Sequence, residues 1–209
     1  VISANRVDNN IVGSVGPAFD HVEVKLSDVG ELMVRGDSVM QGYWENDEAT
    51  RKVMTEDGWL HTGDIAKIEN EIIYITGRVK DIIVLSNGEK ISPADVEHAI
   101  CSDAIFDQTI VIGERKPFLS AIVVLNPEQC RLQGIDTENL NDEAVKAELL
   151  KKIGPYMDEF PGYAQIYKIT ATLDPWEIEN DLLTPTLKIK REKVKELFAQ
   201  EIEQMYAGH

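Results

Sequence analysis

The spacing of apolar residues changes near residue 80, and this change constrains the fold more than any other feature of the sequence. Before it, residues 20–35 alternate apolar and polar positions, which predicts a β-hairpin, and residues 64–76 predict a second pair of strands. A short helix through about Met54 is expected, because Asn46 can cap its first turn. The first part of the chain is therefore predicted to be mostly β.

Beyond residue 80, the period of a strand and the period of a helix alternate along the chain. Strands are predicted at 82–85, 106–113, 119–125 and 165–170. Helices are predicted from the start at Ser92-Pro93, over about 142–158 and over about 191–206. We therefore predict an α+β fold in two parts, a β-rich part and an α+β part of about 130 residues, which join near residues 77–81.

Composition argues against several classes of function. The 209 residues are 43% hydrophobic and 28% charged, as in an ordinary globular protein. No apolar run reaches the ~20 residues that span a bilayer, although a peripheral membrane contact stays open. The net charge of −16 argues against binding nucleic acid through a broad basic face.

The histidines and cysteines indicate neither a metal site nor a disulfide framework. The four histidines are scattered singly, so no metal site is predicted in this chain. Two cysteines, Cys101 and Cys130, do not make a disulfide framework, which predicts a reduced, cytoplasmic setting.

Asp64 ends the first motif with candidate chemistry, the segment Trp59-Leu60-His61-Thr62-Gly63-Asp64. A Thr-Gly turn at a strand edge can present this carboxylate to a diol, as carboxylates are presented to ribose hydroxyls in dinucleotide sites. Taken alone, an Asp after a Gly is more often ordinary turn chemistry.

The second motif covers residues 77–97, at the join of the two predicted parts. Arg78 carries a planar donor group that suits a sugar or a phosphate, and Lys80 lies at the join itself. The loop Ser86-Asn87-Gly88 is made of small residues that can lie against an extended ligand. An interdomain linker followed by a hairpin explains the same residues.

The third motif, residues 182–194, places Lys188 on a loop just before a helix, because Pro185 prevents a continuous helix. An ammonium group on a loop can reach an anion that approaches the domain. Five basic residues and one acidic residue lie between Lys188 and Lys195. A solvated helix face also explains that charge run. No phosphate-binding P-loop, nucleophile elbow or metal-ligand cluster occurs in the sequence.

The motifs occur in the order and spacing of one family: GELMVRGDSVMQGYW (30–44), DGWLHTGD (57–64), GRVKDIIVLSNGEKISPADVE (77–97) and the loop of Lys188. Together they resemble the adenylate-forming superfamily of acyl-CoA synthetases, peptide-synthetase adenylation domains and luciferases. Three details resemble its long-chain fatty acyl-CoA synthetase branch: LHTGD, FPGYAQI (160–166) and LLTPTLKIKR (182–191).

The resemblance implies a fatty acid–CoA ligase that works in two steps. ATP and the fatty acid give an acyl-adenylate and pyrophosphate, and coenzyme A then displaces AMP to form the thioester. It implies that Asp64 binds the ribose hydroxyls and that Arg78 supports the same nucleotide. Lys188 would be the catalytic lysine, in contact with the carboxylate and the α-phosphate.

The resemblance also implies two domains. Residues 1–79 would be the β-rich, barrel-like end of a large N-domain, and residues 80–209 would be a small α+β domain that acts as a mobile lid, with Lys80 as the hinge. Such a lid rotates between the two steps, and hinge residues absorb the change in backbone dihedrals. One face would serve adenylation. The other would serve thioester formation and carries Ser86, Asn87, Gly88 and Lys90.

The resemblance finally implies that the chain is the C-terminal part of a longer enzyme. This expectation agrees with its abrupt start at Val1, without a Met or a signal-peptide pattern. The phosphate loop, most of the ATP site, the fatty-acid pocket and the carboxylate ligand of Mg²⁺ would precede Val1. We therefore expect the chain alone to make no acyl-CoA, and its sequence does not define the acyl chain length.

Two positions depart from the family pattern. Leu187 stands where many relatives have Gly before the lysine, which makes the loop less permissive. The hairpin turn Glu69-Asn70-Glu71 lacks the usual Gly, so Asn70 is expected to supply the left-handed residue.

Three alternative functions stay open. The chain could be the lid of an acyl-AMP ligase that feeds a carrier protein, although GRVKD running directly into the lid favours coenzyme A. It could be a free-standing, lid-type binding module that docks to a separate N-domain. The third alternative, a structural protein with degenerate motifs, is disfavoured because Asp64, Arg78 and Lys188 are all intact.

Overall fold

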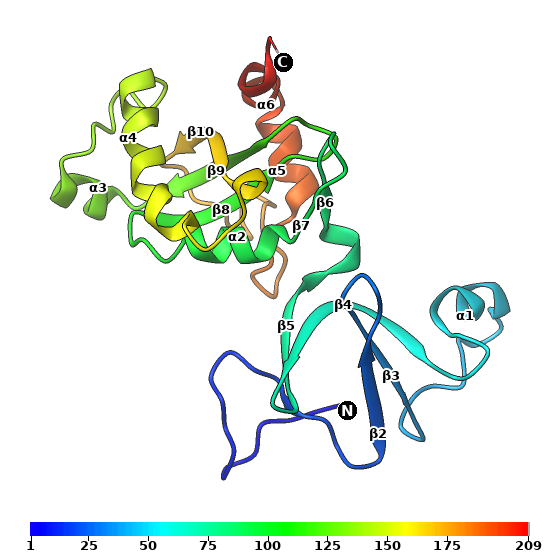
Figure 1. Cartoon of the computed structure of the whole chain (residues 1–209). Helices are drawn as coiled ribbons and strands as arrows, with labels where there is room; N and C mark the ends of the chain where they lie inside the picture. Colours follow the sequence, from blue (N-terminus) through cyan, green and yellow to red (C-terminus); the bar gives the residue numbers. More distant parts are fainter. Residues whose placement is uncertain (209) are drawn as a thin grey trace. The chain divides into compact units, whose positions relative to one another are not determined.

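The computed structural model describes residues 1–208, and the chain divides into two compact units (Figure 1). The first unit is Val1–Ile82 and the second begins at Ile83. The division falls slightly after the join expected between residues 79 and 80. The predicted α+β class is confirmed, since strands dominate the first unit and the second combines strands with helices.

The first unit is an antiparallel sheet with the strand order β1-β5-β4-β3-β2. Its strands are β1 Gly16–Pro17, β2 Val22–Leu26, β3 Glu31–Gly36, β4 Leu60–Glu69 and β5 Ile72–Arg78. Both predicted hairpins are present, as β2–β3 and β4–β5, although β4 begins earlier than predicted. Among the described strands β1 and β2 form the two edges, so the barrel-like subdomain is an open sheet.

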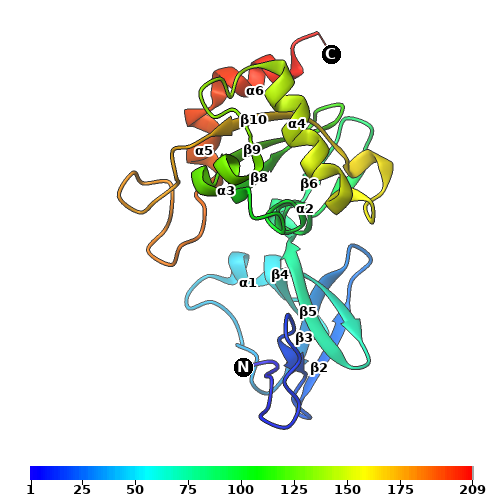
Figure 2. The same ribbon diagram turned by 90° about the vertical axis from the view of Figure 1, so that its left-hand side faces the viewer.

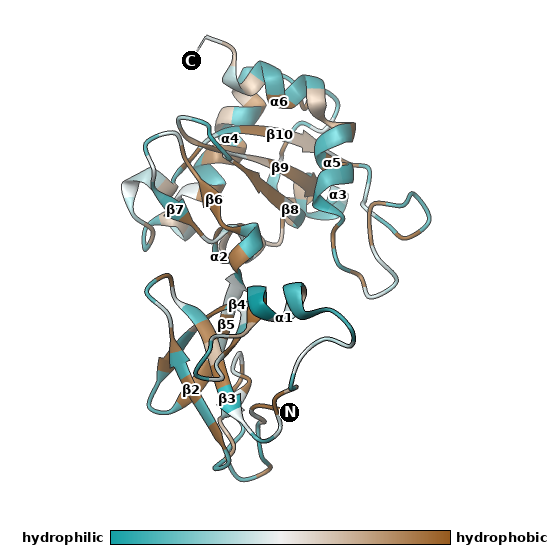
Figure 3. Cartoon of the chain, turned by 90° about the vertical axis from the view of Figure 1, so that its right-hand side faces the viewer, coloured by the Kyte–Doolittle hydropathy of each residue, from teal (hydrophilic) through white to brown (hydrophobic). Residues whose placement is uncertain are grey.

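One face of this sheet carries the core of the first unit, which consists of Val22, Leu32, Val34, Ala66 and Ile73. Helix α1, Asp47–Val53, begins where predicted, since the Asn46 side chain accepts a hydrogen bond from the Ala49 N–H at 3.0 Å. The helix buries none of its residues, and most of its ribbon has the teal colour of hydrophilic residues in Figure 3. The packing of the first unit therefore depends on the strands.

The turn between β4 and β5 holds two residues in the left-handed region. Asn70 has φ 50° and Glu71 has φ 67°, between the paired residues Glu69 and Ile72. Two left-handed residues form the type I′ turn, whose twist matches that of antiparallel strands. The prediction for Asn70 is confirmed, and Glu71 adopts the second left-handed position without a signal in the sequence.

The second unit is built around β9, Leu119–Leu125, which lies between β8 and β10. Strand β8, Phe106–Ile112, pairs with it in antiparallel fashion, and strand β10, Ile166–Thr172, pairs in parallel. Every residue of β9 is buried. A strand buried on both sides needs helices on both faces of its sheet.

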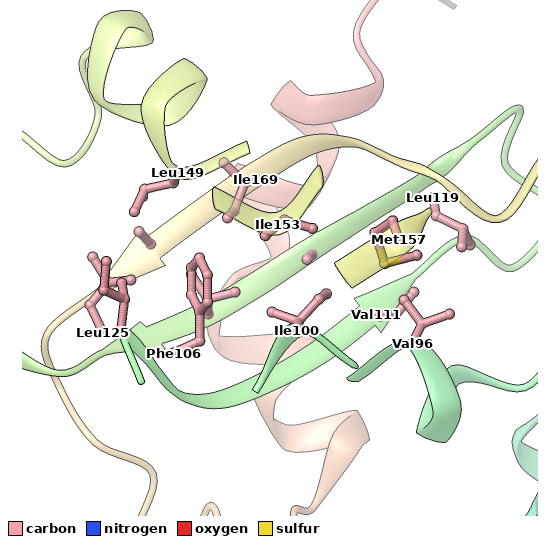
Figure 4. Packing of buried hydrophobic residues seen from close by; sticks show 14 of the residues in the cluster. Val96, Ile100, Phe106, Val111, Leu119, Leu125, Leu149, Ile153, Met157 and Ile169 are labelled. Atoms are coloured by element: carbon pink, nitrogen blue, oxygen red, sulfur yellow. The ribbon is translucent and has the colours of Figure 1, made fainter. Parts of the chain in front are cut away.

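The helices that cover these faces are α2 Pro93–Ile100, α4 Glu143–Ile153, α5 Arg191–Leu197 and α6 Ala199–Tyr206 (Figure 2). On one face, α2 and α4 pack through Ile100 and Leu149 (Figure 4). On the other face, α5 and α6 pack through Val194 and Met205 against Ile122. The sheet therefore separates two core clusters.

Shorter elements connect these parts: the hairpin strands β6 Ile83–Val84 and β7 Lys90–Ile91, helix α3 Pro127–Gln133, and the 3₁₀ turns η1 Val79–Asp81, η2 Gly154–Met157 and η3 Gly162–Ala164. Helix α3 corrects the sequence interpretation, which took Asn126-Pro127 only as the end of a strand. The Asn126 side chain accepts from the Gln129 N–H at 3.0 Å, and Pro127 occupies the first turn. These are the positions that favour a helix start.

Two helix predictions were too long. The helix expected over 142–158 ends at Ile153, where Gly154 and the following proline begin a 3₁₀ turn. The helix expected over 191–206 is interrupted at Phe198, whose φ of −103° and ψ of 25° leave the helical region. Phe198 packs against the second core cluster, so tertiary packing overrides the continuous helical pattern.

Replacing Leu149 with Ala tests the packing of α4 on the sheet. The Leu149 side chain is fully buried, so truncation leaves a cavity and should lower the free energy of unfolding by about 2–5 kcal/mol. Urea unfolding followed by circular dichroism at 222 nm measures this change, because most helices lie in the second unit. Lys151→Ala, at an exposed position of the same helix, is the control and should stay close to the parent. Equal midpoints for the two variants would contradict the packing described here.

Candidate functional site

Asp64 lies at an irregularity in the pairing of β4 with β3. His61 pairs with Met33 and Ile65 pairs with Glu31, so β4 uses more residues than β3 between these two pairs. Such a bulge disrupts the ladder and re-aims the side chains of the extra residues. The bulge therefore sets the direction of Asp64.

Two side chains replace the ladder bonds that the bulge loses. The Glu31 carboxylate accepts from the Gly63 N–H at 2.8 Å. The Thr62 hydroxyl donates to the Leu32 carbonyl at 2.7 Å and accepts from the Asp64 N–H at 3.1 Å. Gly63 has φ 76°, a conformation that only glycine adopts without steric cost. The backbone around Asp64 is thus held from both sides.

Strand pairing places Arg78, the other residue predicted to contact a nucleotide, next to Asp64. The two residues face each other across β4 and β5, and Arg78 Nε lies 3.2 Å from Asp64 Oδ1. Their side chains are 65% and 29% exposed, respectively. An exposed pair of this kind contributes little to stability, so its groups can exchange partners with a ligand at low cost.

A cavity of about 410 Å³ lies in the first unit beside the bulge. Its walls are formed by Glu31, Tyr43, Lys52, Val53, His61, Thr62, Gly63, Arg78, Val79 and Lys80. Lys80, the predicted hinge, is exposed within the 3₁₀ turn η1. The volume lies within the range of small-molecule sites, and Arg78 and Lys80 supply positive charge at its wall.

The predicted thioester-forming residues lie in the second unit, on the tight turn between β6 and β7. The Gly88 N–H donates to the Leu85 carbonyl at 2.9 Å, and the Glu89 N–H donates to Asn87 Oδ1 at 3.1 Å. Ser86, Asn87, Gly88 and Lys90 are all exposed. The turn is therefore ordered by its own backbone while its outer surface stays open to a ligand.

Lys188 lies at the tip of a loop that closes on itself. Leu183 and Ile189 form an isolated β-bridge at its base. Thr184 binds both sides of the tip, because its N–H donates to the Lys188 carbonyl at 2.8 Å and its hydroxyl accepts from the Lys188 N–H at 3.0 Å. The preceding residue, Leu187, has φ 60°. The loop thus adopts a left-handed backbone at this position without a glycine.

The basic run from Lys188 to Lys195 does not form one uniform face. Four of its five basic residues are engaged in ion pairs: Lys190 and Lys193 with Asp181, Arg191 with Glu97, and Lys195 with Glu192. Within residues 1–208, Lys188 is the member of the run that forms no ion pair. The interpretation as a solvated helix face therefore fits Lys195, whereas Lys188 is exposed on the loop that precedes helix α5.

Glu97 and Arg191 anchor the loop of Lys188 to the sheet, a role that sequence reasoning missed. Arg191 Nη1 and Nη2 donate to the two Glu97 oxygens at 2.8 and 2.6 Å. The same carboxylate accepts from the Val111 N–H of β8 at 2.7 Å. A bidentate pair of this kind is strong and directional. Both residues lay within quoted motifs, but nothing in the sequence signals that residues so far apart pair with each other.

The described residues contain no group of three His, Cys, Asp or Glu side chains that could hold a metal ion. Among the described helices, none is long and apolar enough to cross a membrane.

The family model described as AMP-binding enzyme C-terminal domain matches residues 80–209. The chain belongs to this family, whose enzymes form adenylates. The predicted α+β fold and the resemblance to adenylate-forming enzymes are thus confirmed, whereas the roles assigned to single residues stay predictions.

Over nearly all of its own length, the chain is similar to proteins named as fatty acid ligases. The chain is 33% identical to long-chain-fatty-acid–CoA ligase FadD15 of Mycobacterium tuberculosis, over 98% of this chain and 36% of that protein. It is 32% identical to the long-chain-fatty-acid–[acyl-carrier-protein] ligase AEE15, chloroplastic, of Arabidopsis thaliana, over 99% of this chain and 31% of that protein. The chain spans about a third of the length of the curated relatives it matches.

A solved structure shows the same fold. The A domain of the carboxylic acid reductase from Segniliparus rugosus, in complex with AMP and a carboxylic acid, matches with a TM-score of 0.74 and 26% identity. The match covers 92% of this chain and 32% of that chain. Both units of the chain therefore have counterparts in an adenylation domain.

Replacing Asp181 with Asn tests the brace behind the Lys188 loop. Hydrogen bonds from Lys190 and Lys193 lower the pKa of the Asp181 carboxyl from 3.8 to about 2. A carboxyl with a depressed folded pKa contributes stability above its unfolded pKa and loses it as the pH falls towards the folded pKa. The difference in unfolding free energy between parent and variant should therefore be present at about pH 5 and disappear between about pH 4 and pH 2.

Urea unfolding at a series of pH values measures this difference. Asp174→Asn is the matched control, because Asp174 is exposed and forms no ion pair within the described part of the chain. A difference for Asp181→Asn that does not change with pH would show that the two lysines do not stabilise the charged carboxylate.

Proposed function

We propose that this chain forms part of an ATP-dependent long-chain fatty acid–CoA ligase, to which it supplies a mobile lid and the catalytic lysine, Lys188. The observation that carries the proposal is that Lys188, at the tip of a braced loop, is the one basic residue between positions 188 and 195 that forms no ion pair within the described residues. Similarity to FadD15 supports the choice of substrate class.

The first step joins the fatty acid to AMP. A carboxylate oxygen attacks the α-phosphorus of ATP, the bond to the β-phosphate breaks, and pyrophosphate leaves. Negative charge accumulates on the phosphoryl oxygens, and a placed ammonium stabilises this charge. We assign that role to Lys188, because its exposed side chain can approach the phosphate without giving up an ion pair.

The nucleotide is held by the first unit in this proposal. Asp64 accepts hydrogen bonds from the ribose hydroxyls, and Arg78, its neighbour at 3.2 Å, donates to the same nucleotide. Mg²⁺ bound with ATP would neutralise phosphate charge, and the carboxylate that would hold it is expected outside this chain.

The second step transfers the acyl group to coenzyme A. The thiol sulfur attacks the acyl carbonyl carbon, AMP leaves, and the thioester forms. Lys80 serves as the hinge about which residues 80–209 rotate, so that the turn of Ser86, Asn87, Gly88 and Lys90 replaces Lys188 at the reacting atoms. Lys80 is exposed within a short 3₁₀ turn, and such a position is typical of a hinge residue whose backbone dihedrals change.

A carrier protein is the second candidate for the acyl acceptor. It is favoured by the comparable similarity to a relative named as a long-chain-fatty-acid–[acyl-carrier-protein] ligase. Coenzyme A and a phosphopantetheine-bearing carrier offer the same thiol. The enzyme must therefore distinguish the two acceptors through contacts away from that thiol. Supplying the longer enzyme with each acceptor in turn separates the two, and we expect the faster turnover with coenzyme A.

The cytoplasmic location remains a prediction from the cysteine pattern. Relatives of comparable identity are named as chloroplastic or peroxisomal proteins. Peripheral contact with a membrane also remains open.

Replacing Lys188 with Ala in the longer enzyme that carries this chain tests the proposal. Adenylation should fall on the order of 10²-fold or more, as when other preorganised electrostatic donors are removed. Fatty-acid-dependent exchange of pyrophosphate into ATP measures this step. Thioester formation from preformed acyl-adenylate should be nearly unchanged, because the lid presents another face in that step.

Lys195→Ala is the matched control, since Lys195 belongs to the same basic run but pairs with Glu192 on the helix surface. It should leave both steps unchanged. A Lys188→Ala enzyme with normal pyrophosphate exchange would remove the basis for calling Lys188 catalytic.

A further inference from the structure

Glu31 is the one charged side chain that is buried in the described part of the chain, with 8% of its surface exposed. Burying a carboxylate is costly unless hydrogen bonds or an opposite charge compensate. The compensation here comes from two residues of one short segment of β4. Oε1 accepts from the Gly63 N–H at 2.8 Å, and Oε2 lies 2.8 Å from His61 Nδ1.

The two contacts hold the β4 bulge at its start and in its middle. His61 is the last regularly paired residue before the bulge, and Gly63 directly precedes Asp64. The carboxylate therefore spans the segment whose conformation decides where Asp64 points. Without the Glu31 contact the backbone at Gly63 could rotate, because glycine has access to more backbone conformations than any other residue type.

The base of Glu31 is itself well fixed. Its N–H donates to the Ser27 hydroxyl at 3.1 Å, and its carbonyl accepts from the Ser27 N–H at 2.9 Å. These bonds tie Glu31 to the turn between β2 and β3. The carboxylate is thus carried by a rigid hairpin and not by a mobile loop.

We propose that Glu31 is a positioning residue that fixes Asp64 for nucleotide binding, with His61 as its second contact. The inference rests on the proposed role of Asp64 in binding the ribose. Glu31, His61 and Gly63 all line the cavity of the first unit, so a change in the bulge alters the wall of that cavity. Displacing a binding group by about 1 Å can reduce turnover about 10²-fold.

Three substitutions remove these contacts to different extents. Glu31→Ala removes both acceptors. Glu31→Gln keeps the size of the side chain and one acceptor oxygen for the Gly63 N–H, while a neutral imidazole can change tautomer and accept from the new amide. His61→Ala removes one contact only. The expected order of damage is therefore Glu31→Ala first, His61→Ala second and Glu31→Gln last.

Steady-state kinetics of the longer enzyme that carries this chain measure the effect. The KM for ATP should rise by about 10-fold or more in Glu31→Ala and by no more than about 3-fold in Glu31→Gln. The KM for the fatty acid should stay unchanged in both. Glu23→Gln is the control, since Glu23 is an exposed carboxylate of the same sheet, paired with Arg35, and its loss should leave the KM for ATP unchanged.

A double-mutant cycle with Asp64→Ala decides whether Glu31 acts through Asp64. The increase in the KM for ATP caused by Glu31→Ala should be absent when Asp64 is already replaced by Ala. An equal increase in both backgrounds overturns the inference, and so does a normal KM for ATP in Glu31→Ala. If Asp64→Ala itself leaves the KM for ATP unchanged, the nucleotide-binding role of Asp64 fails instead, independently of Glu31.

Loss of folding is detected by the urea midpoint of each variant. If Glu31→Ala does not fold, the same cycle with His61→Ala takes its place. The KM for ATP should then rise with Asp64 present and not with Asp64→Ala, and any other result for His61 overturns the inference.

Discussion

Burial of β9 on both faces is the constraint on which the second unit depends. Apart from Ser120, its residues belong to two core clusters on opposite faces of the sheet, so helices must cover both sides. Leu182, Leu183 and Val194 belong to the second cluster, and these residues flank the loop of Lys188. The apolar packing of the sheet therefore holds both stems of that loop, and the Glu97–Arg191 pair adds a directional contact at its base. Only the tip, with Lys188, extends into solvent.

Charge is distributed to suit this arrangement. The chain carries a net charge of −16, yet each basic neighbour of Lys188 in the run is matched by a nearby carboxylate. The four neighbours share three carboxylates, since Lys190 and Lys193 both pair with Asp181, and within the described residues Lys188 is the basic residue of the run that no carboxylate contacts. An exposed ammonium contributes little to folding, so the residue can be used for binding an anion without loss of stability.

Local patterns predicted the strands, the α1 cap and the β4–β5 turn, because each depends on residues that are close in the sequence. Asn70 could be assigned to a left-handed position from its own chemistry. The missed features depend on tertiary contacts. Phe198 interrupts the last helix through packing, and the Glu31–Gly63 and Glu97–Arg191 contacts join residues far apart in the chain. Buried charges such as Glu31 are rare, and sequence alone does not show which acidic residue is buried.

Asp64 and Lys188 share one local design, although they lie in different units. Each directly follows a residue with left-handed backbone, Gly63 at φ 76° and Leu187 at φ 60°. Gly63 takes this conformation without steric cost, whereas a residue with a Cβ is strained by roughly 1–2 kcal/mol. Such strain persists only where surrounding contacts over-determine the backbone. For Leu187 those contacts come from Thr184, which bonds to Leu187 and to both polar groups of the Lys188 backbone. Thr184 therefore has the same role for Lys188 as Glu31 and Thr62 have for Asp64. In both places a polar side chain stabilises an irregular turn that regular strand pairing would not allow. The residue after the left-handed position is thereby presented to a ligand.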